Sequence, residues 1–90
     1  MSDRKDMELI AELVPAGSRV LDLGCGNGEL LAHLIARKGC SGYGVEIADA
    51  NVLACTQRGV DVLQLNLEDG LALFGDASFD VVLQLDTMQH

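Results

Sequence analysis

Basic side chains are scarce in this 90-residue sequence. It contains six Lys and Arg against fourteen Asp and Glu, which gives a formal net charge of −8. Proteins that bind a nucleic acid backbone need clustered Lys and Arg. The one basic pair outside the N-terminus, Arg37 and Lys38, lies where a helix is expected to end. The composition therefore argues against nucleic acid as the main partner.

The sequence also lacks a long apolar run and a cysteine motif. No stretch is long enough to span a bilayer, and no apolar signal core follows the charged segment Met1–Asp6. We therefore expect a soluble, cytoplasmic protein with no membrane partner. Cys25, Cys40 and Cys55 form no C-x-x-C pair. This favours buried thiols in a reducing compartment over a metal site or a disulfide framework.

What the sequence does contain is an alternation of helical and strand patterns, without repeats or linkers. Helical spacing of apolar residues predicts helices over Asp6–Val14 and Gly28–Lys38. It predicts a third helix that ends at Arg58 and begins at Asp49 or Asn51, either of which can cap it. Short apolar runs predict strands over Arg19–Leu23, Gly42–Ile47, Val60–Leu65 and Phe79–Leu85, with a turn at Asn66–Gly70 and a short apolar segment at Leu71–Phe74. This alternation indicates one α/β domain over residues 1–90, with a Rossmann-like parallel sheet in the strand order 3-2-1-4.

The stretch Val20–Leu30 is the most informative part of the chain. An apolar strand ends in Gly24, Gly26 and Gly28, and a helix follows directly. Glycines let a ligand lie against bare main chain, and free N–H groups and the positive end of the helix dipole face the same place. The simpler interpretation is a glycine-rich turn without a ligand. The G-x-G-x-G spacing differs from the G-x-G-x-x-G of dinucleotide sites, so a nicotinamide dinucleotide ranks well below other ligands.

Polar residues follow the predicted strands at the edge where the glycines lie. Glu46 ends the second strand, about twenty residues after the glycines, where a carboxylate can accept both hydroxyls of a ribose. Its simpler role is that of a solvated carboxylate. Cys25 lies in the glycine loop at a helix N-terminus, a position that favours a lowered thiol pKa. No base is near it in the sequence, so we do not expect a nucleophilic role.

Asp22, the three glycines and the start of the helix together resemble motif I of the class I S-adenosylmethionine-dependent methyltransferases. Over nearly its whole length the chain also resembles the methionine biosynthesis protein MetW family. The matching runs include Pro15–Gly26, Gly42–Ile47, Arg58–Val60 and Ser78–Asp80. Members of that family are about twice as long, so the resemblance implies the truncated, cofactor-binding half of a class I methyltransferase fold.

The resemblance implies S-adenosylmethionine or S-adenosylhomocysteine as the cofactor. In methyltransferases the position of Asn66 is commonly Asp, which accepts from the adenine amino group, while the next backbone N–H, here that of Leu67, donates to the ring. Gln84 and Leu85 end the fourth strand, where main-chain groups can meet the amino acid end of the cofactor. The implied cofactor-binding residues are Asp22, Gly24, Cys25, Gly26, Gly28, Glu46, Ile47, Asn66, Leu67 and Gln84. No catalytic residue and no metal ligand are implied.

Two functions follow from the resemblance. The first is a methyltransferase-like protein linked to methionine biosynthesis. The second is a non-catalytic accessory or regulatory subunit of homoserine acyltransferase that binds the cofactor as a signal. Because Phe79–Leu85 is apolar and the chain ends at His90, we also expect self-association of this polypeptide through an unpaired fourth strand.

Overall fold

The computed structural model of the chain describes residues 3–74 and 79–84. Helices and strands alternate along these residues in the order α1 (Asp3–Leu13), β1 (Arg19–Leu23), α2 (Glu29–Lys38), β2 (Ser41–Glu46), α3 (Asp49–Arg58), β3 (Val62–Gln64), α4 (Leu67–Phe74) and β4 (Val81–Leu83). The strands are all parallel and lie in the order β3-β2-β1-β4. The predicted α/β class and strand order are confirmed.

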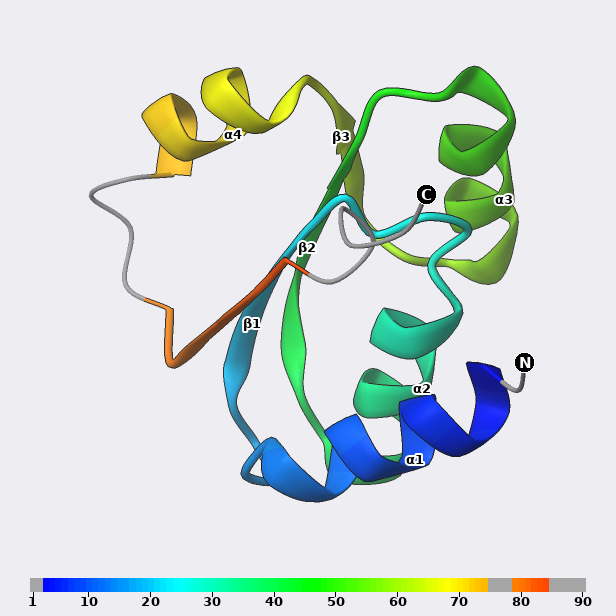
Figure 1. The fold of residues 1–90 in the computed structure, drawn as a ribbon, viewed down its shortest axis with the longest axis vertical. Coiled ribbons are helices and arrows are strands. Elements are labelled where there is room, and N and C mark those ends of the chain that lie inside the picture. Colours follow the sequence, from blue (N-terminus) through cyan, green and yellow to red (C-terminus); the bar gives the residue numbers. More distant parts are fainter. Residues whose placement is uncertain (1–2, 75–78, 85–90) are drawn as a thin grey trace.

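β1 lies at the centre of the molecule. It pairs with β2 on one side and β4 on the other, so that Leu21 lies opposite Tyr43 and Val82. Its residues are buried from Val20 to Leu23, because both faces of the strand are covered. Figure 1 shows α1, α2 and α3 on one side of the sheet and α4 on the other. The carboxyl ends of the strands lie toward α3 and α4.

The two faces of the sheet carry different cores, because successive residues of a strand point to opposite faces. On the face of α1, α2 and α3, Val20 packs with Leu31, Leu34 and Cys55. On the face of α4, Leu21, Leu23 and Val45 are buried, and partly buried aromatic rings pack against them. The ring of Phe74 stacks on Tyr43 at 5.6 Å and meets the edge of Phe79 at 5.7 Å.

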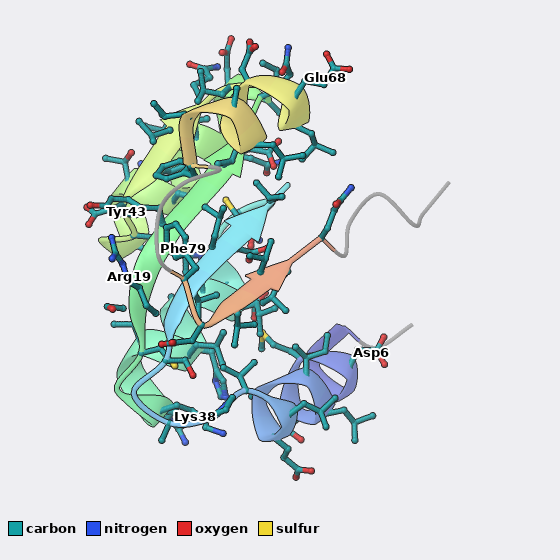
Figure 2. All side chains as sticks on the ribbon, turned by 90° about the vertical axis from the view of Figure 1, so that its left-hand side faces the viewer. Asp6, Arg19, Lys38, Tyr43, Glu68 and Phe79 are labelled. Carbon is teal, nitrogen blue, oxygen red and sulfur yellow. The ribbon has the colours of Figure 1, made fainter. Side chains whose placement is uncertain are left out.

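Arg19, the first residue of β1, adds a cation to this aromatic group. The Arg19 guanidinium lies 4.9 Å from the centre of the Phe79 ring, and Figure 2 shows Arg19, Tyr43 and Phe79 together on one side of the molecule. Glu68 lies at the opposite end of the molecule from Lys38 in the same view. The aromatic group is therefore part of the α4 core rather than of the carboxyl edge.

The predicted turn at Asn66–Gly70 is wrong, because α4 begins at Leu67. Asn66 caps this helix: its Oδ1 accepts the N–H of Asp69 at 2.7 Å, and its carbonyl accepts the N–H of Gly70. Gly70 lies inside α4 and does not end the helix. It is buried where a Cβ would lie 3.0 Å from Val45 Cγ1, so it lets α4 approach the sheet closely.

The fourth strand is shorter than predicted. Phe79 and Asp80 precede it, and the Asp80 carboxylate accepts the backbone N–H of Arg19 at 2.8 Å. Leu85 lies outside the described residues. Val82 of this strand is 55% exposed, so the strand is not covered on both faces by the described residues. In the described part of the chain, no helix is long and apolar enough to cross a membrane.

Candidate functional site

The glycine loop between β1 and α2 is held by hydrogen bonds of its own backbone. Gly24, Gly26 and Gly28 all have positive φ angles, which favour glycine. The N–H groups of Gly24 and Cys25 both donate to the Val45 carbonyl, at 2.7 and 3.0 Å, and that of Gly28 donates to the Cys25 carbonyl at 3.1 Å. These three N–H groups are therefore bonded within the protein. The loop is shaped by the protein itself.

Glu46, at the end of β2, joins the glycine loop to the start of α3. Glu46 is 7% exposed as a whole residue. Oε1 accepts the N–H of Gly26 at 2.8 Å, and Oε2 accepts the N–H of Ala48 at 3.1 Å and the side-chain amide of Asn51 at 3.3 Å. A buried carboxylate is stable only when it is hydrogen-bonded in this way. The solvated-carboxylate interpretation of Glu46 is therefore excluded.

Two thiols lie under the loop. The Cys25 and Cys55 sulfurs are 3.6 Å apart, and both lie within hydrogen-bond range of the Gly26 carbonyl. Burial, and then the hydrogen bond with Cys55, raise the pKa of the Cys25 thiol well above its ordinary value of 9.0. The predicted lowering of this pKa is wrong, because desolvation outweighs the helix N-terminus. Cys25 is a neutral, packed thiol.

Gly26 and Gly28 differ in what a side chain at each position would meet. A Cβ on Gly28 would lie 2.8 Å from Cys55 Sγ, whereas a Cβ on Gly26 would meet nothing within 4 Å. Gly28 therefore makes room for α3, and Gly26 faces open space. Gly24 lines the cleft described next.

A cleft of about 470 Å³ opens beside the loop at the carboxyl ends of β1, β2 and β3. Its lining combines apolar side chains with a few polar ones and consists of Gly24, Val45, Glu46, Ile47, Leu65, Asn66, Leu67 and Glu68. Small-molecule sites have this composition, with a few polar groups that orient the ligand.

The structure brings most of the predicted site residues together. Those that line the cleft are Gly24, Glu46, Ile47, Asn66 and Leu67. Gly26 is bonded to Glu46, and Asp22 is buried on β1 directly before the loop. Cys25 and Gly28 pack against α3, and Gln84 lies exposed at the end of β4, outside the cleft lining. The cofactor-binding role of all ten remains a prediction.

Sequence reasoning missed the contribution of α3. The sequence indicates a possible cap at Asn51 and a buried thiol at Cys55, but both also contact the site. Arg58 also donates from Nε to the Asn27 carbonyl at 3.1 Å. The signal was the spacing of 51, 55 and 58, which places three potential donors on one helix face. Leu65 and Glu68 of the cleft lining were also missed.

The sequence matches the family described as "Methionine biosynthesis protein MetW" over residues 4–90. The chain belongs to this family. It is 47% identical, over 92 aligned residues, to the bifunctional methionine biosynthesis protein MetXA/MetW of Rhodopirellula baltica. The match covers 93% of this chain and 15% of that protein. The chain is thus similar to one part of a much longer relative.

Solved structures are similar to the chain in fold. An S-adenosylmethionine-dependent methyltransferase from Thiobacillus denitrificans, in complex with S-adenosyl-L-homocysteine, matches with a TM-score of 0.77 and 22% identity, over 92% of this chain and 36% of that one. An RNA methyltransferase from Salinibacter ruber, in complex with the same ligand, gives 0.75 and 21%, over 93% and 59%. At these identities the likeness shows the class I methyltransferase-like fold. The described sheet is part of that fold.

Proposed function

We propose that this chain binds S-adenosylmethionine or S-adenosylhomocysteine in the cleft beside the glycine loop. The observation that carries the proposal is the buried carboxylate of Glu46, which is bonded to Gly26 of the loop and also lines the cleft. A ribose hydroxyl needs a fixed acceptor, and Glu46 is fixed by three donors. The ligands in the two similar solved structures support the choice of cofactor.

Each remaining residue has a role in this proposal. Asn66 and the N–H of Leu67 face the adenine, with Ile47 covering the ring. The Gly24–Gly28 segment and Asp22 lie under the amino acid end, and main-chain groups near Gln84 complete it. The Asn66 Oδ1 already accepts the Asp69 N–H, but an amide oxygen has a second lone pair for the adenine amino group. The residues present therefore fit the cofactor.

We further propose that the protein is a methyltransferase-like protein of methionine biosynthesis. When bound, S-adenosylmethionine supplies an activated methyl group. The described residues position the cofactor, and positioning is the larger part of what methyl transfer from a sulfonium requires. No residue is assigned as a general base or nucleophile. Residues 1–90 then form the cofactor-binding domain of a cytoplasmic protein.

The accessory role is the second candidate. The MetXA/MetW relative carries two methionine biosynthesis functions in one chain, as its name states. This supports a homoserine acyltransferase as the partner and the cofactor as a signal.

We also propose that the 90-residue polypeptide self-associates through β4, which lies at an edge of the described sheet with Val82 exposed. Light scattering at tens of micromolar tests this, and a monomer would contradict it.

Calorimetry on the 90-residue chain tests the cofactor. S-adenosylhomocysteine should bind and NADH should not, because the glycine spacing differs from the G-x-G-x-x-G of dinucleotide sites. Absence of heat with S-adenosylhomocysteine at millimolar concentration would contradict the proposal. Transfer of a tritiated methyl group to a component of cell extract by the full-length protein would then separate the enzyme from the accessory role.

A further inference from the structure

One face of α3 contacts the cofactor-binding segments along the whole helix. Asn51, Cys55 and Arg58 follow one another at spacings of four and three residues, so they lie on the same face. Asn51 Nδ2 donates to Glu46 Oε2 at 3.3 Å, Cys55 Sγ to the Gly26 carbonyl at 3.3 Å, and Arg58 Nε to the Asn27 carbonyl at 3.1 Å. α3 therefore holds the glycine loop and Glu46 with the same set of side chains.

The donors around Glu46 use most of its capacity to accept hydrogen bonds. A carboxylate has about four acceptor positions, two on each oxygen. On Oε2 both are taken, by Ala48 N–H and by Asn51 Nδ2, and on Oε1 one is taken, by Gly26 N–H. The position that is left lies on Oε1. The donors on Oε2 set the direction in which Oε1 faces. Of the two donors on Oε2, Ala48 donates from its backbone and Asn51 from its side chain.

The start of α3 also favours a negative charge at this place. The helix begins at Asp49, with Ala48 as its cap, and its dipole is positive at that end. Asn51 is half-buried, and its amide adds a donor without adding a charge. An aspartate at this position would place a second carboxylate against Oε2 and would remove that donor. The neutral amide is therefore a side chain that suits a fixed Glu46 carboxylate.

We propose that Asn51 is a positioning residue of the cofactor site, which acts through Glu46 and sets the orientation in which its carboxylate meets a ribose. This inference rests on the proposed cofactor binding and extends it to a residue outside the cleft lining. Asn51 orients the carboxylate from the helix side, and Gly26 orients it from the loop side. The loop and α3 thus act as one unit through Glu46.

The first test compares two substitutions that add the same charge to α3. Asn51→Asp should weaken S-adenosylhomocysteine binding by about tenfold or more, because it replaces a hydrogen bond to a charged group by repulsion. Gln57→Glu is the matched control: Gln57 is exposed on the same helix, and its substitution should change the affinity by less than about twofold. Equal affinities for Asn51→Asp and the parent would overturn the proposal.

The second test needs no ligand. Asn51→Ala should accelerate exchange of the Gly26 amide proton by about fivefold, because its acceptor, Glu46 Oε1, is then less well held. The amide of Gly59, which donates to Cys55 and Thr56 carbonyls at the end of α3, serves as the reference for the helix. A purely structural role would accelerate Gly59 as well or leave Gly26 unchanged, and either result would overturn the proposal. If the parent binds no S-adenosylhomocysteine, the proposed function fails, while the exchange rates still decide the role of Asn51.

Discussion

The two sides of the cleft are built differently. On the side of the glycine loop, Glu46 is buried and its carboxylate accepts three hydrogen bonds from within the protein. On the side of α4, Glu68 lines the cleft and is exposed. The loop side is therefore fixed before any ligand arrives. The α4 side of the cleft is more exposed to solvent.

This difference separates two tasks of a binding site. Orientation of a small polar group, such as a ribose, requires donors and acceptors that do not move. The loop side supplies these by tying β1, β2 and α3 together. The apolar lining near Leu65 and Leu67 can supply area for a flat ring without such precision. Substitutions on the two sides should therefore differ in what they change.

The largest expected effect belongs to Gly28→Ala. Its φ of 84° disfavours a side chain, and its Cβ would lie 2.8 Å from Cys55 Sγ, so we expect a loss of about 2–4 kcal/mol in the free energy of unfolding. Gly26→Ala is the matched control. Its φ is 60° and its Cβ meets nothing within 4 Å, so the loss should be only about 1 kcal/mol.

Urea unfolding measures both losses, and equal values would contradict the packing role of Gly28.

The variants Gly28→Ala and Gly26→Ala also separate an effect on folding from an effect on binding. Gly26→Ala should fold and yet bind S-adenosylhomocysteine poorly, since its new methyl group enters the open space of the loop. Undiminished binding by this variant would mean that the ligand does not approach Gly26.

A smaller effect concerns pH. Because burial raises the pKa of Cys25, the folded thiol stays protonated at a pH where the unfolded thiol ionises. Stability should therefore be at its full value below pH 9 and should fall as the pH rises above it, by up to about 1.4 kcal/mol per pH unit for this thiol. Unfolding measured from pH 8 to 10 tests this. Cys25→Ser should have a shallower slope, and an identical slope would contradict it.

The smallest effect is expected on the α4 side. Asn66→Ala removes the cap of α4 and should lower the free energy of unfolding by about 1 kcal/mol. Asn66→Asp keeps the acceptor and should stay within about 0.5 kcal/mol of the parent. Thermal unfolding distinguishes the two. If Asn66→Ala is as stable as Asn66→Asp, the hydrogen bond to Asp69 does not hold the start of this helix.

The architecture could be predicted because its signals are local. Apolar runs marked the strands, and Gly39 and Gly59 ended α2 and α3 with left-handed backbone, as expected. The error at Asn66–Gly70 arose because Asn and Gly favour turns as well as helix ends. Asn66 followed three residues later by Asp69 is also a pattern of helix caps. The close packing of Gly70 on Val45 favours the helix over the turn.

The site was predictable only in part. The glycines and Glu46 stand out because strand order brings their positions to one edge of the sheet. The role of Asn51 and the raised pKa of Cys25 depend on how α3 packs on the loop. A local sequence pattern does not predict this packing. The burial that makes Glu46 a fixed acceptor also makes Cys25 unreactive. Both follow from tertiary contacts.

We propose that Glu46, rather than acidity of the cleft in general, holds the cofactor. Glu68 lines the same cleft from α4 but is exposed, so it provides a matched carboxylate. Calorimetric titration with S-adenosylhomocysteine should show a loss of about 1.5–3 kcal/mol in binding free energy for Glu46→Gln and less than about 0.5 kcal/mol for Glu68→Gln. Equal losses for the two variants, or none for Glu46→Gln, would contradict the account.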